Sequence, residues 1–411
     1  MASVAFTKRI QTSKWPFRLL IFYIAIDFLR PQDTFHFLAT IRFPGFIALG
    51  LALYWFKKEK IKSLFSHPLL KLNAVFLFLI GFSVVYSVNT YSPTMRFIQC
   101  TWMTLALVMP MLLIIDNKQK LLALIRAWVF IHGCLALLVI KHGGTGTGGF
   151  LMDENDVALA LVMALPYGVY LFSYENTKNW KITAAVAVLL QIFAVAYSFS
   201  RGGFLGLLCV LLMFFFFSEK KFKHASLTIV FVLVFGTLLI GLLPDKYFAE
   251  MQTSTDYQSG TGQQRLVHWD IGLQMFYDNP LWGVGAENYP WNVGQYEMKS
   301  TMFDPVTMHS LAGRQAHSMY FTLIPELGLI GSTVYVSILV LLFKRLFAVL
   351  RRYKNDVTKI EYVIATKAII VSMVGYLTAG AFISVLYYPH FWYFLALTLV
   401  VLKLVNNDES Q

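Results

Sequence analysis

The sequence predicts an all-α membrane protein, a polytopic bundle of about twelve transmembrane helices with one large outer loop between helices 9 and 10. Hydrophobic residues make up 57% of the 411 residues and charged residues only 14%, whereas a soluble domain usually carries about 25% charged residues. The mean hydropathy is +0.60. Apolar stretches long enough to cross a bilayer as helices also recur along most of the chain. These observations exclude a soluble enzyme and a disordered protein.

Twelve apolar stretches are predicted to form the transmembrane helices. The first two are short or interrupted by Asp27, Pro31 and Pro44, so a re-entrant hairpin is the alternative there. The first also follows a basic segment as a signal peptide would, but no small-residue cleavage motif comes after it, and we expect a retained helix. The twelve stretches are residues 16–30, 41–56, 68–88, 95–115, 121–140, 156–174, 182–199, 203–217, 225–243, 318–343, 361–385 and 390–405.

The distribution of Lys and Arg predicts the orientation, because positively charged loops stay on the cytoplasmic side. If the N-terminus is cytoplasmic, the cytoplasmic segments hold most of the 34 Lys and Arg residues. The opposite orientation would place most of these residues on the outer side. Both termini are therefore expected in the cytoplasm. The net charge of +12 then reports membrane orientation, and no nucleic-acid partner is expected.

Neither the cysteines nor the Gly-rich segment predicts a disulfide, metal or nucleotide site. Cys100, Cys134 and Cys209 all lie within apolar stretches, which excludes a disulfide framework or a cysteine metal cluster. The Gly-rich residues 142–150 lack the Lys-Ser/Thr end of a phosphate-binding loop and lie on the outer side, so nucleotide binding is not predicted. We expect neither a metal nor a cofactor.

The chain is expected to divide into three parts. Residues 1–243 would hold helices 1–9, residues 244–317 a periplasmic loop, and residues 318–411 helices 10–12 with a short cytoplasmic tail. The loop is rich in Gly, Gln, Asp, Asn, Tyr and Trp, and loops of this length are uncommon and usually functional.

One segment of this loop, residues 263–277, is predicted to be an amphipathic helix. Its apolar residues recur at helical spacing, which would place them on one face at the interface or over the bundle. Asn279 and Pro280 would end the helix. The residues of the predicted apolar face are Leu266, Trp269, Leu273 and Phe276.

Arg201 is the sharpest candidate for chemistry on the outer side. It lies in residues 198–203 (SFSRGG), a short turn between two apolar helices, so its guanidinium is expected at the membrane–water boundary. A snorkelling anchor is the ordinary interpretation of such an arginine. The small residues around it, however, would let another group approach closely.

Two further candidates lie on the same side of the membrane. Arg265 is on the predicted loop helix and His317 opens the next transmembrane helix; taken singly, a solvated helix charge and a structural histidine are the simpler interpretations. With Arg201, however, they converge from three separate segments. Arginine forks suit phosphate oxygens, and a histidine can take a proton near neutral pH. The three together predict a site that grips an anionic head group, most simply a lipid pyrophosphate, beside an acceptor hydroxyl.

Other residues are candidates for supporting roles in such a site. Loop aromatic side chains would suit stacking on sugar rings, although an interfacial aromatic belt explains them equally well. These aromatic residues are Trp269, Tyr277, Trp282, Tyr289, Trp291 and Tyr296. Intramembrane charges are functional by default, but Glu326 could equally pair with a basic residue and hold helices together. The charged or titratable candidates are Glu326, Asp27, Arg314, His309, Asp153 and Lys367.

These segments resemble the O-antigen ligase/polymerase superfamily of bacterial membrane glycosyltransferases, which includes lipopolysaccharide O-antigen ligases, O-antigen polymerases and protein O-oligosaccharyltransferases. Ser318 departs from the pattern, since many relatives have Asn after the histidine. Residues 27–33 are similar to the opening of a subgroup of O-glycosylation ligases. The matching segments are SFSRGGFLGLL at 198–208, Arg265 with Trp269, NPLWGVG at 279–285 with Asn288, AHS at 316–318 with Tyr320, and ELGLIG at 326–331.

The resemblance implies that Arg201 and Arg265 bind the diphosphate of an undecaprenyl-linked glycan, with Arg314 as a third contact. It implies that His317 activates the acceptor hydroxyl, or only positions it. The reaction would be an inverting transfer on the periplasmic face of the bacterial inner membrane, without a nucleotide sugar or a required metal. The expected acceptor is lipid A-core, as in lipopolysaccharide biosynthesis; a growing glycan or a protein is the alternative. The residues expected to support the site are Glu326, Ser200 and Trp269.

A secondary transporter or lipid flippase is the alternative from a different class, since twelve helices suit both and a fold does not fix a function. Transporters of that size usually have two related halves with broken helices in matching positions. Here the large loop has no counterpart in the first half of the sequence, and the basic and histidine candidates lie at the outer surface. These features favour the glycosyltransferase.

Overall fold

The structure is a computed structural model that describes residues 14–56, 67–218, 261–306 and 308–409. Within these ranges the chain is helical, with one isolated antiparallel bridge between Gly148 and Leu151 and no strand. Eight helical segments of the described residues are long and apolar enough to cross a membrane, and two shorter apolar helices accompany them. The prediction of a polytopic helical membrane protein is confirmed.

The first half of the chain follows the predicted stretches closely. Those predicted at 16–30 and 41–56 are helical, joined by two short helices, and whether they fully span stays a prediction. The stretch predicted at 95–115 contains a π-helical turn shortly before Pro110, whose ring cannot continue the ordinary hydrogen-bond pattern. The helices are α1 (Trp15–Leu29), α2 (Pro31–Thr34), α3 (His36–Thr40), α4 (Phe43–Phe56), α6 (Pro68–Phe82) with the 3₁₀ turn Ser83–Val85, α7 (Tyr91–Met103), the π turn Thr104–Val108, α8 (Met109–Ile114), α9 (Lys118–Lys141), α10 (Glu154–Tyr174), α11 (Lys178–Tyr197) and α12 (Arg201–Phe217).

The second half holds the described part of the large loop and the last helices. The predicted ninth span, 225–243, and residues 244–260 of the predicted loop lie outside the described residues. The count of twelve helices and the three-part division therefore stay predictions. The helices are α15 (Thr261–Asp278), α16 (Tyr289–Tyr296) with the 3₁₀ turn Glu297–Lys299, α17 (Tyr320–Tyr353), the 3₁₀ turn Val357–Lys359, α18 (Ile360–Ala379) with the 3₁₀ turn Gly380–Phe382, and α19 (His390–Glu409).

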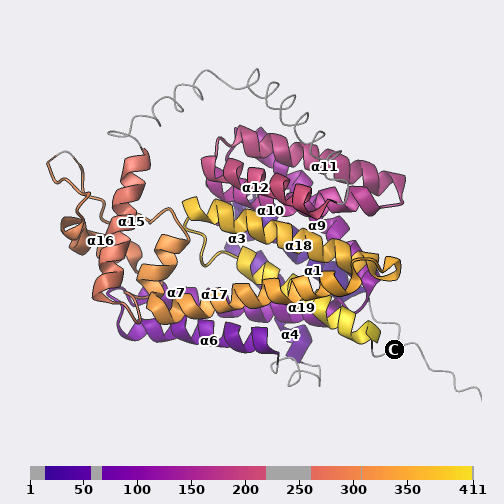
Figure 1. Cartoon of the computed structure of the whole chain (residues 1–411), viewed down its shortest axis with the longest axis horizontal. Coiled ribbons are helices and arrows are strands. Elements are labelled where there is room, and N and C mark those ends of the chain that lie inside the picture. Colours follow the sequence, from indigo (N-terminus) through magenta and orange to yellow (C-terminus); the bar gives the residue numbers. More distant parts are fainter. Residues whose placement is uncertain (1–13, 57–66, 219–260, 307, 410–411) are drawn as a thin grey trace, which may run out of the picture.

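Helices α10 and α18 form the centre of the bundle. Helix α10 packs against α9, α11, α12 and α18, and every residue from 156 to 168 is buried. A helix that is apolar all round is expected in such a position. Helix α18 packs against α12, α17 and α19 as well, and Figure 1 shows it between α12 and α17.

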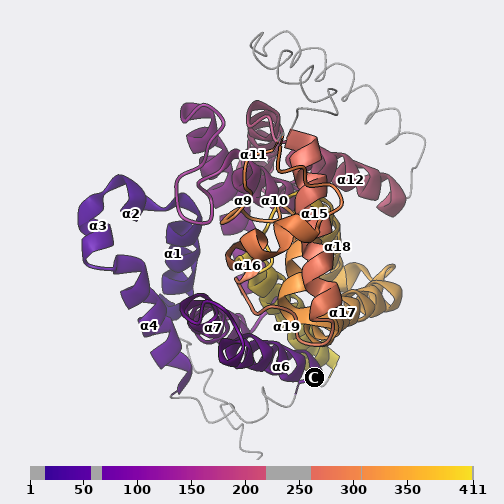
Figure 2. The same cartoon turned by 90° about the vertical axis from the view of Figure 1, so that its left-hand side faces the viewer.

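Residues 261–306 and 308–319 form a small unit, here called the loop unit, at one end of the bundle. Figure 1 shows α15 and α16 at that end, and Figure 2 shows them in front of the helix ends. We call this end of the bundle the loop end. The unit has an apolar core of its own, to which both helices contribute.

The predicted loop helix is present as α15, and its fully buried residues are not those of the predicted apolar face. Val267, Ile271 and Met275 are fully buried, whereas Leu266 is 38% exposed. The buried residues are four apart and pack against α16 within the loop unit. The helix therefore buries one side in the core of the loop unit, and the position of the predicted apolar face at the membrane interface stays a prediction.

A break in α17 joins the loop unit to the bundle. Pro325 has no backbone N–H, and Gly328 has a φ of +58° and a ψ of −162°, a conformation that is essentially restricted to glycine. The backbone groups released by this break pair with residues 280–285 of the loop. The hydrogen bonds run from Val284 N to Pro325 O (2.8 Å), from Gly285 N to Glu326 O (2.8 Å), from Leu329 N to Pro280 O (2.8 Å) and from Ile330 N to Leu281 O (3.2 Å).

Two glycines permit this close approach of two backbones. A β carbon on Gly328 would lie 2.5 Å from the Leu281 carbonyl carbon, and one on Gly283 would overlap the carbonyl group of Glu326. Residues 279–285 (NPLWGVG) and 326–331 (ELGLIG) therefore pack backbone against backbone and form one joint between the loop unit and α17. Because polar backbone groups inside a membrane bundle must be satisfied by protein, this joint allows the helix to break there.

Candidate active site

Arg201 is the first residue of α12, at the loop end of the bundle. Ser200 caps this helix: its Oγ accepts a hydrogen bond from the Gly203 N–H (3.0 Å) and donates one to Asn155 Oδ1 at the start of α10 (2.7 Å). Phe199, just before it, has a left-handed φ of +55°. The Arg201 side chain is exposed, whereas Ser200 is buried. Ser200 thus fixes the turn from which Arg201 projects.

The small residues after Arg201 serve helix packing. A β carbon on Gly203 would lie 2.5 Å from the Ala158 β carbon on α10, and one on Gly202 would lie 3.2 Å from the Phe382 β carbon. The close approach that the sequence suggested is therefore made by neighbouring helices. It holds the start of α12 tightly against the start of α10.

We expect Gly203→Ala to destabilise the folded protein by about 1–3 kcal/mol, the usual cost of extra atoms in a packed interior. Thermal unfolding in detergent should show a lower Tm. Gly45→Ala is the matched control, because no atom lies within 4 Å of a β carbon built on Gly45 in α4. A Gly203→Ala protein as stable as this control would contradict the tight packing of α12 on α10.

Arg265 lies on α15 and is half-buried. Burial lowers the pKa of its guanidinium, the nearby Arg201 charge lowers it further, and the Asp153 carboxylate opposes the shift. The fold therefore brings Arg201 and Arg265 close enough to repel each other. Like charges at one place favour the binding of an anion between them.

His317 joins the loop unit to α17, and its backbone is held on both sides. The Ala316 carbonyl accepts a hydrogen bond from Trp269 Nε1 (3.1 Å), and the Met319 N–H donates one to the Gly380 carbonyl (2.7 Å). His317 itself has a φ of +49°, which is uncommon for a residue other than glycine. Backbone conformations of this kind cluster at functional sites.

The His317 imidazole lies among the same charges as Arg265. Partial burial lowers the pKa of His317 below 6.5, the Arg265 and Arg314 charges lower it further, and Asp153 opposes them. The ring of His268 is 6.4 Å away, centroid to centroid, and burial together with His317 and Arg314 lowers the pKa of His268 to about 4. Both imidazoles are therefore mainly neutral at pH 7, and a neutral imidazole can accept a proton.

Arg314 and Trp269 lie beside this histidine pair. Arg314 is exposed and donates a hydrogen bond from Nη1 to Gln264 Oε1 on α15 (3.4 Å). Trp269 stacks on Phe321, with ring centroids 4.8 Å apart and planes 2° from parallel, while its indole N–H holds the backbone next to His317. Trp269 therefore has a positioning contact that its aromatic character alone did not indicate.

The other loop aromatic residues differ in exposure. Tyr289 and Tyr296 are buried, whereas Tyr277, Trp282 and Trp291 are 64%, 41% and 56% exposed. One side of Trp282 already packs near Phe82, at 5.1 Å between centroids. The hypothesis of stacking on sugar rings therefore narrows to these three exposed rings.

Glu326 anchors the loop unit to α17. It is 1% exposed and accepts hydrogen bonds from the backbone N–H groups of Glu287 (2.8 Å) and Tyr289 (3.1 Å) and from the Tyr387 hydroxyl (2.8 Å). The ion pair with a basic residue is made by Glu287, whose partner is Arg96. Glu326 thus binds the start of α16 and supports the site through the backbone that it holds.

The start of α10 contributes Asp153, which the sequence named only as a secondary candidate. Asp153 caps this helix by accepting a hydrogen bond from Asn155 N (2.6 Å), and its charge acts on both Arg265 and His317. The available signal was a run of capping residues before an apolar helix. That pattern predicts a helix start, and only the fold brings the helix start to the arginines.

The remaining residues that the sequence offered as candidates have no interaction with Arg201, Arg265 or His317 among those described for them. Asp27 in α1 accepts a hydrogen bond from the Tyr393 hydroxyl in α19 (2.9 Å), which joins two helices of the bundle. His309 is exposed in the segment between α16 and α17. Lys367 lies on α18, toward the end of the bundle opposite the loop unit.

The Gly-rich residues 142–150 pack on the segment that follows α1. Arg30 and Asp33 form an ion pair (2.5 Å), and β carbons on Gly148 and Gly149 would overlap the Asp33 carboxylate and the Arg30 guanidinium. The glycines are therefore required by a close approach of protein groups.

The fold and the site define a class: a polytopic helical membrane protein with arginines and a histidine gathered at one end of its bundle. Within the described ranges, no three His, Cys, Asp or Glu side chains lie close enough to hold a metal ion.

Residues 186–336 match the family model described as O-antigen ligase. This region contains Arg201, Arg265, Arg314 and His317, and the match confirms the resemblance to the O-antigen ligase superfamily. It supports a membrane enzyme of the ligase/polymerase type. An uncharacterized protein of Haemophilus influenzae is 21% identical over 358 residues, which cover 82% of this chain and 87% of that protein.

Proposed function

We propose that the protein is an inner-membrane glycosyltransferase that transfers a glycan from undecaprenyl diphosphate to lipid A-core on the periplasmic face. The observation that carries the proposal is the gathering of Arg201, Arg265 and His317, from three separate segments, within electrostatic reach at the loop end of the bundle. The family match supplies the reaction class. The choice of lipid A-core as acceptor rests on the ligase resemblance.

In this proposal the arginines hold the diphosphate of the donor. A guanidinium presents its N–H donors as a planar fork that fits phosphate oxygens. The charges of Arg201 and Arg265 repel each other, and a diphosphate between them would add an attraction to each. Arg314, which is exposed beside His317, would be a third contact at the rim of the site.

His317 is proposed to act as the general base on the acceptor hydroxyl. The acceptor oxygen forms a bond to the anomeric carbon of the glycan while the bond from that carbon to the diphosphate oxygen breaks. The electron pair stays with undecaprenyl diphosphate, whose growing negative charge the arginines stabilise. The acceptor proton passes to His317, and the nearby Asp153 favours the imidazolium that results.

A transfer assay tests the proposal. Purified protein in detergent is supplied with an undecaprenyl-diphosphate glycan, with or without lipid A-core, and the products are separated on a gel beside those of His317→Ala. We expect one upward shift of lipid A-core, which the variant lacks. A ladder on the lipid carrier without added acceptor would identify a polymerase instead. No product in either lane would contradict both, and protein acceptors and then vesicle transport would be examined.

A further inference from the structure

Asn155, the second residue of α10, is held at both ends of its side-chain amide. Its Oδ1 accepts a hydrogen bond from the Ser200 hydroxyl (2.7 Å). Its Nδ2 donates one to Asp153 Oδ1 (2.7 Å) and a longer one to Glu154 Oε1 (3.3 Å). A carboxylate only accepts hydrogen bonds, so the amide nitrogen has to face Asp153 and the amide oxygen has to face Ser200. The side chain therefore uses a donor and an acceptor in two different directions.

The first of these contacts leads to the turn that carries Arg201. Ser200 caps α12 through the Gly203 N–H (3.0 Å), and Arg201 is the first residue of that helix. Ser200 is 3% exposed, so water has little access to its hydroxyl and the amide oxygen of Asn155 is its partner.

The second contact leads to the carboxylate of Asp153, whose charge acts on Arg265 and His317. The Asn155 backbone N–H also donates to Asp153 Oδ1 (2.6 Å), but that bond lies within the start of α10. The Asn155 side chain extends the connection to α12, and it thereby ties the acidic part of the candidate site to the turn of Arg201.

The chemistry of this connection requires an amide. Alanine at position 155 would supply neither hydrogen-bonding group. Aspartate would accept from Ser200, but it would have no donor for Asp153 and would place a second carboxylate against it, which is unfavourable. Asparagine supplies both groups without a charge.

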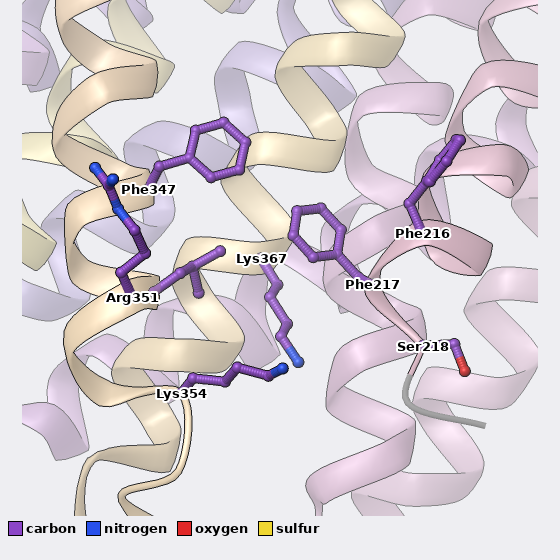
Figure 3. A pocket seen from close by; sticks show the side chains of 8 residues that line it. Phe216, Phe217, Ser218, Phe347, Arg351, Lys354 and Lys367 are labelled. Atoms are coloured by element: carbon purple, nitrogen blue, oxygen red, sulfur yellow. The ribbon is translucent and has the colours of Figure 1, made fainter. Parts of the chain in front are cut away.

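The charged and titratable groups beside His317 come from three segments, and Asp153 is the one acid among those described. Figure 3 shows the opposite end of α12, with Lys354 and Lys367 nearby. Helix α12 has 17 residues and is therefore about 25 Å long, so salt screens the charges at its far end from the site. The groups beside His317 are Asp153 at the start of α10, Arg265 and His268 on α15, and Arg314 before α17.

We propose that Asn155 is a positioning residue for the transfer reaction, which fixes the Asp153 carboxylate relative to the turn that carries Arg201. Its catalytic consequence rests on the proposed function. Without the amide, the exposed Asp153 side chain is bound to the backbone of its own helix and is no longer tied to α12. The imidazolium that forms when His317 takes up the acceptor proton then loses part of its support.

Titration of His317 by NMR, in the purified full chain without donor or acceptor, tests this connection. The nine histidines are labelled with carbon-13, and the His317 signal is assigned with His317→Gln. Asp153→Asn keeps a capping side chain and removes the charge, so it should lower the pKa of His317. Asn155→Ala should lower that pKa by a smaller amount. The double variant should match Asp153→Asn alone, because a residue that acts through another adds nothing once the other is gone.

The gel assay gives the effect on transfer. Asn155→Ala should lower kcat by up to about 100-fold, the scale expected when a group at the site is displaced by about 1 Å. The acidic limb of kcat/KM should move to lower pH with the pKa of His317. Asn179→Ala is the matched control, because Asn179 is likewise the second residue of its helix, α11, and is exposed. It should leave the rate and the titration unchanged.

Thermal unfolding checks that each variant is folded. If Asn155→Ala is not, Ser200→Ala breaks the other contact of the amide and should shift the titration of His317 in the same direction. An unchanged or raised pKa of His317, or a further shift in the double variant, would overturn the positioning role even if kcat falls. A lowered pKa in a protein without transfer activity would support the connection and contradict the proposed function.

Discussion

Arg265→Ala is expected to lower kcat/KM for glycan transfer by about 100- to 1000-fold, as the loss of one group that stabilises a developing oxyanion usually does. Arg265 is half-buried and close to both Arg201 and His317, so water screens its charge at the leaving diphosphate less than it screens an exposed cation. The initial rate in the gel assay, measured over a range of donor concentrations, is the test.

The control is Lys299→Ala, which removes an exposed cation of the same loop unit. Lys299 pairs with Asp278 (2.5 Å), and exposed pairs contribute less than about 1 kcal/mol, so transfer should change less than about twofold. Arg265→Lys keeps the charge and loses the fork, and an intermediate rate is expected. Full turnover by Arg265→Ala would rule out the diphosphate assignment.

The double variant Arg201→Ala/Arg265→Ala adds a test of whether the two arginines hold one group. Residues that act on the same charge are not additive. The double variant should therefore lose much less than the product of the two single losses. Independent, multiplicative losses would place the two arginines on different parts of the donor.

His317→Gln is expected to lower kcat by about 100- to 10,000-fold, the range that general base catalysis usually contributes. It should also remove the acidic limb of the pH–rate profile. The pKa of His317 is lowered in the folded protein, so the neutral base persists below pH 6.5 and wild-type kcat/KM should fall only under that value. A bound diphosphate is negative and raises the pKa of His317, so the limb in kcat should lie at higher pH.

Two results would contradict a role of His317 in proton transfer. One is an acidic limb that survives unchanged in His317→Gln, and the other is a wild-type profile without any limb. His268 does not confuse the measurement, because its pKa of about 4 places its titration at lower pH. His268→Gln is the matched control, and it should keep the limb.

The lowered pKa values of His268 and His317 also make the free energy of unfolding depend on pH. As pH falls through 6.5, the imidazoles of the unfolded chain take up protons, while His268 in the folded protein stays neutral to about pH 4. The unfolded state then binds more protons, so the free energy of unfolding decreases as the pH is lowered. Thermal unfolding should therefore be measured at each pH of the rate profile, so that a lower rate caused by unfolding is distinguished from one caused by protonation of His317.

Local sequence predicted the helices well because the length of an apolar stretch is a local property. The stretches predicted at 182–199 and 203–217 are found as Lys178–Tyr197 and Arg201–Phe217. The breaks in regular structure were less predictable. Pro325 and Gly328 interrupt α17 because residues 280–285 supply the missing hydrogen-bond partners, and no spacing within α17 reveals a partner so far away in the chain.

Part of the candidate site was likewise predictable from the sequence, and part depended on the fold. Arg201, Arg265 and His317 were identified by residue type and by resemblance, and the fold places them within electrostatic reach of one another. Asp153 was only a secondary candidate, because its place beside them depends on how α10 packs against α12. Glu326 was expected near the chemistry, yet its hydrogen bonds go to the backbone at the start of α16.

By itself, the sequence determined the membrane class, the helical architecture and the residue types of the site, since these depend on hydropathy and on local pattern. Only the tertiary structure decided that α15 buries Val267, Ile271 and Met275 and that a broken α17 carries the loop unit. The physical reason is that these outcomes depend on which distant surfaces meet, and such contacts are set by packing and backbone hydrogen bonds across the whole bundle.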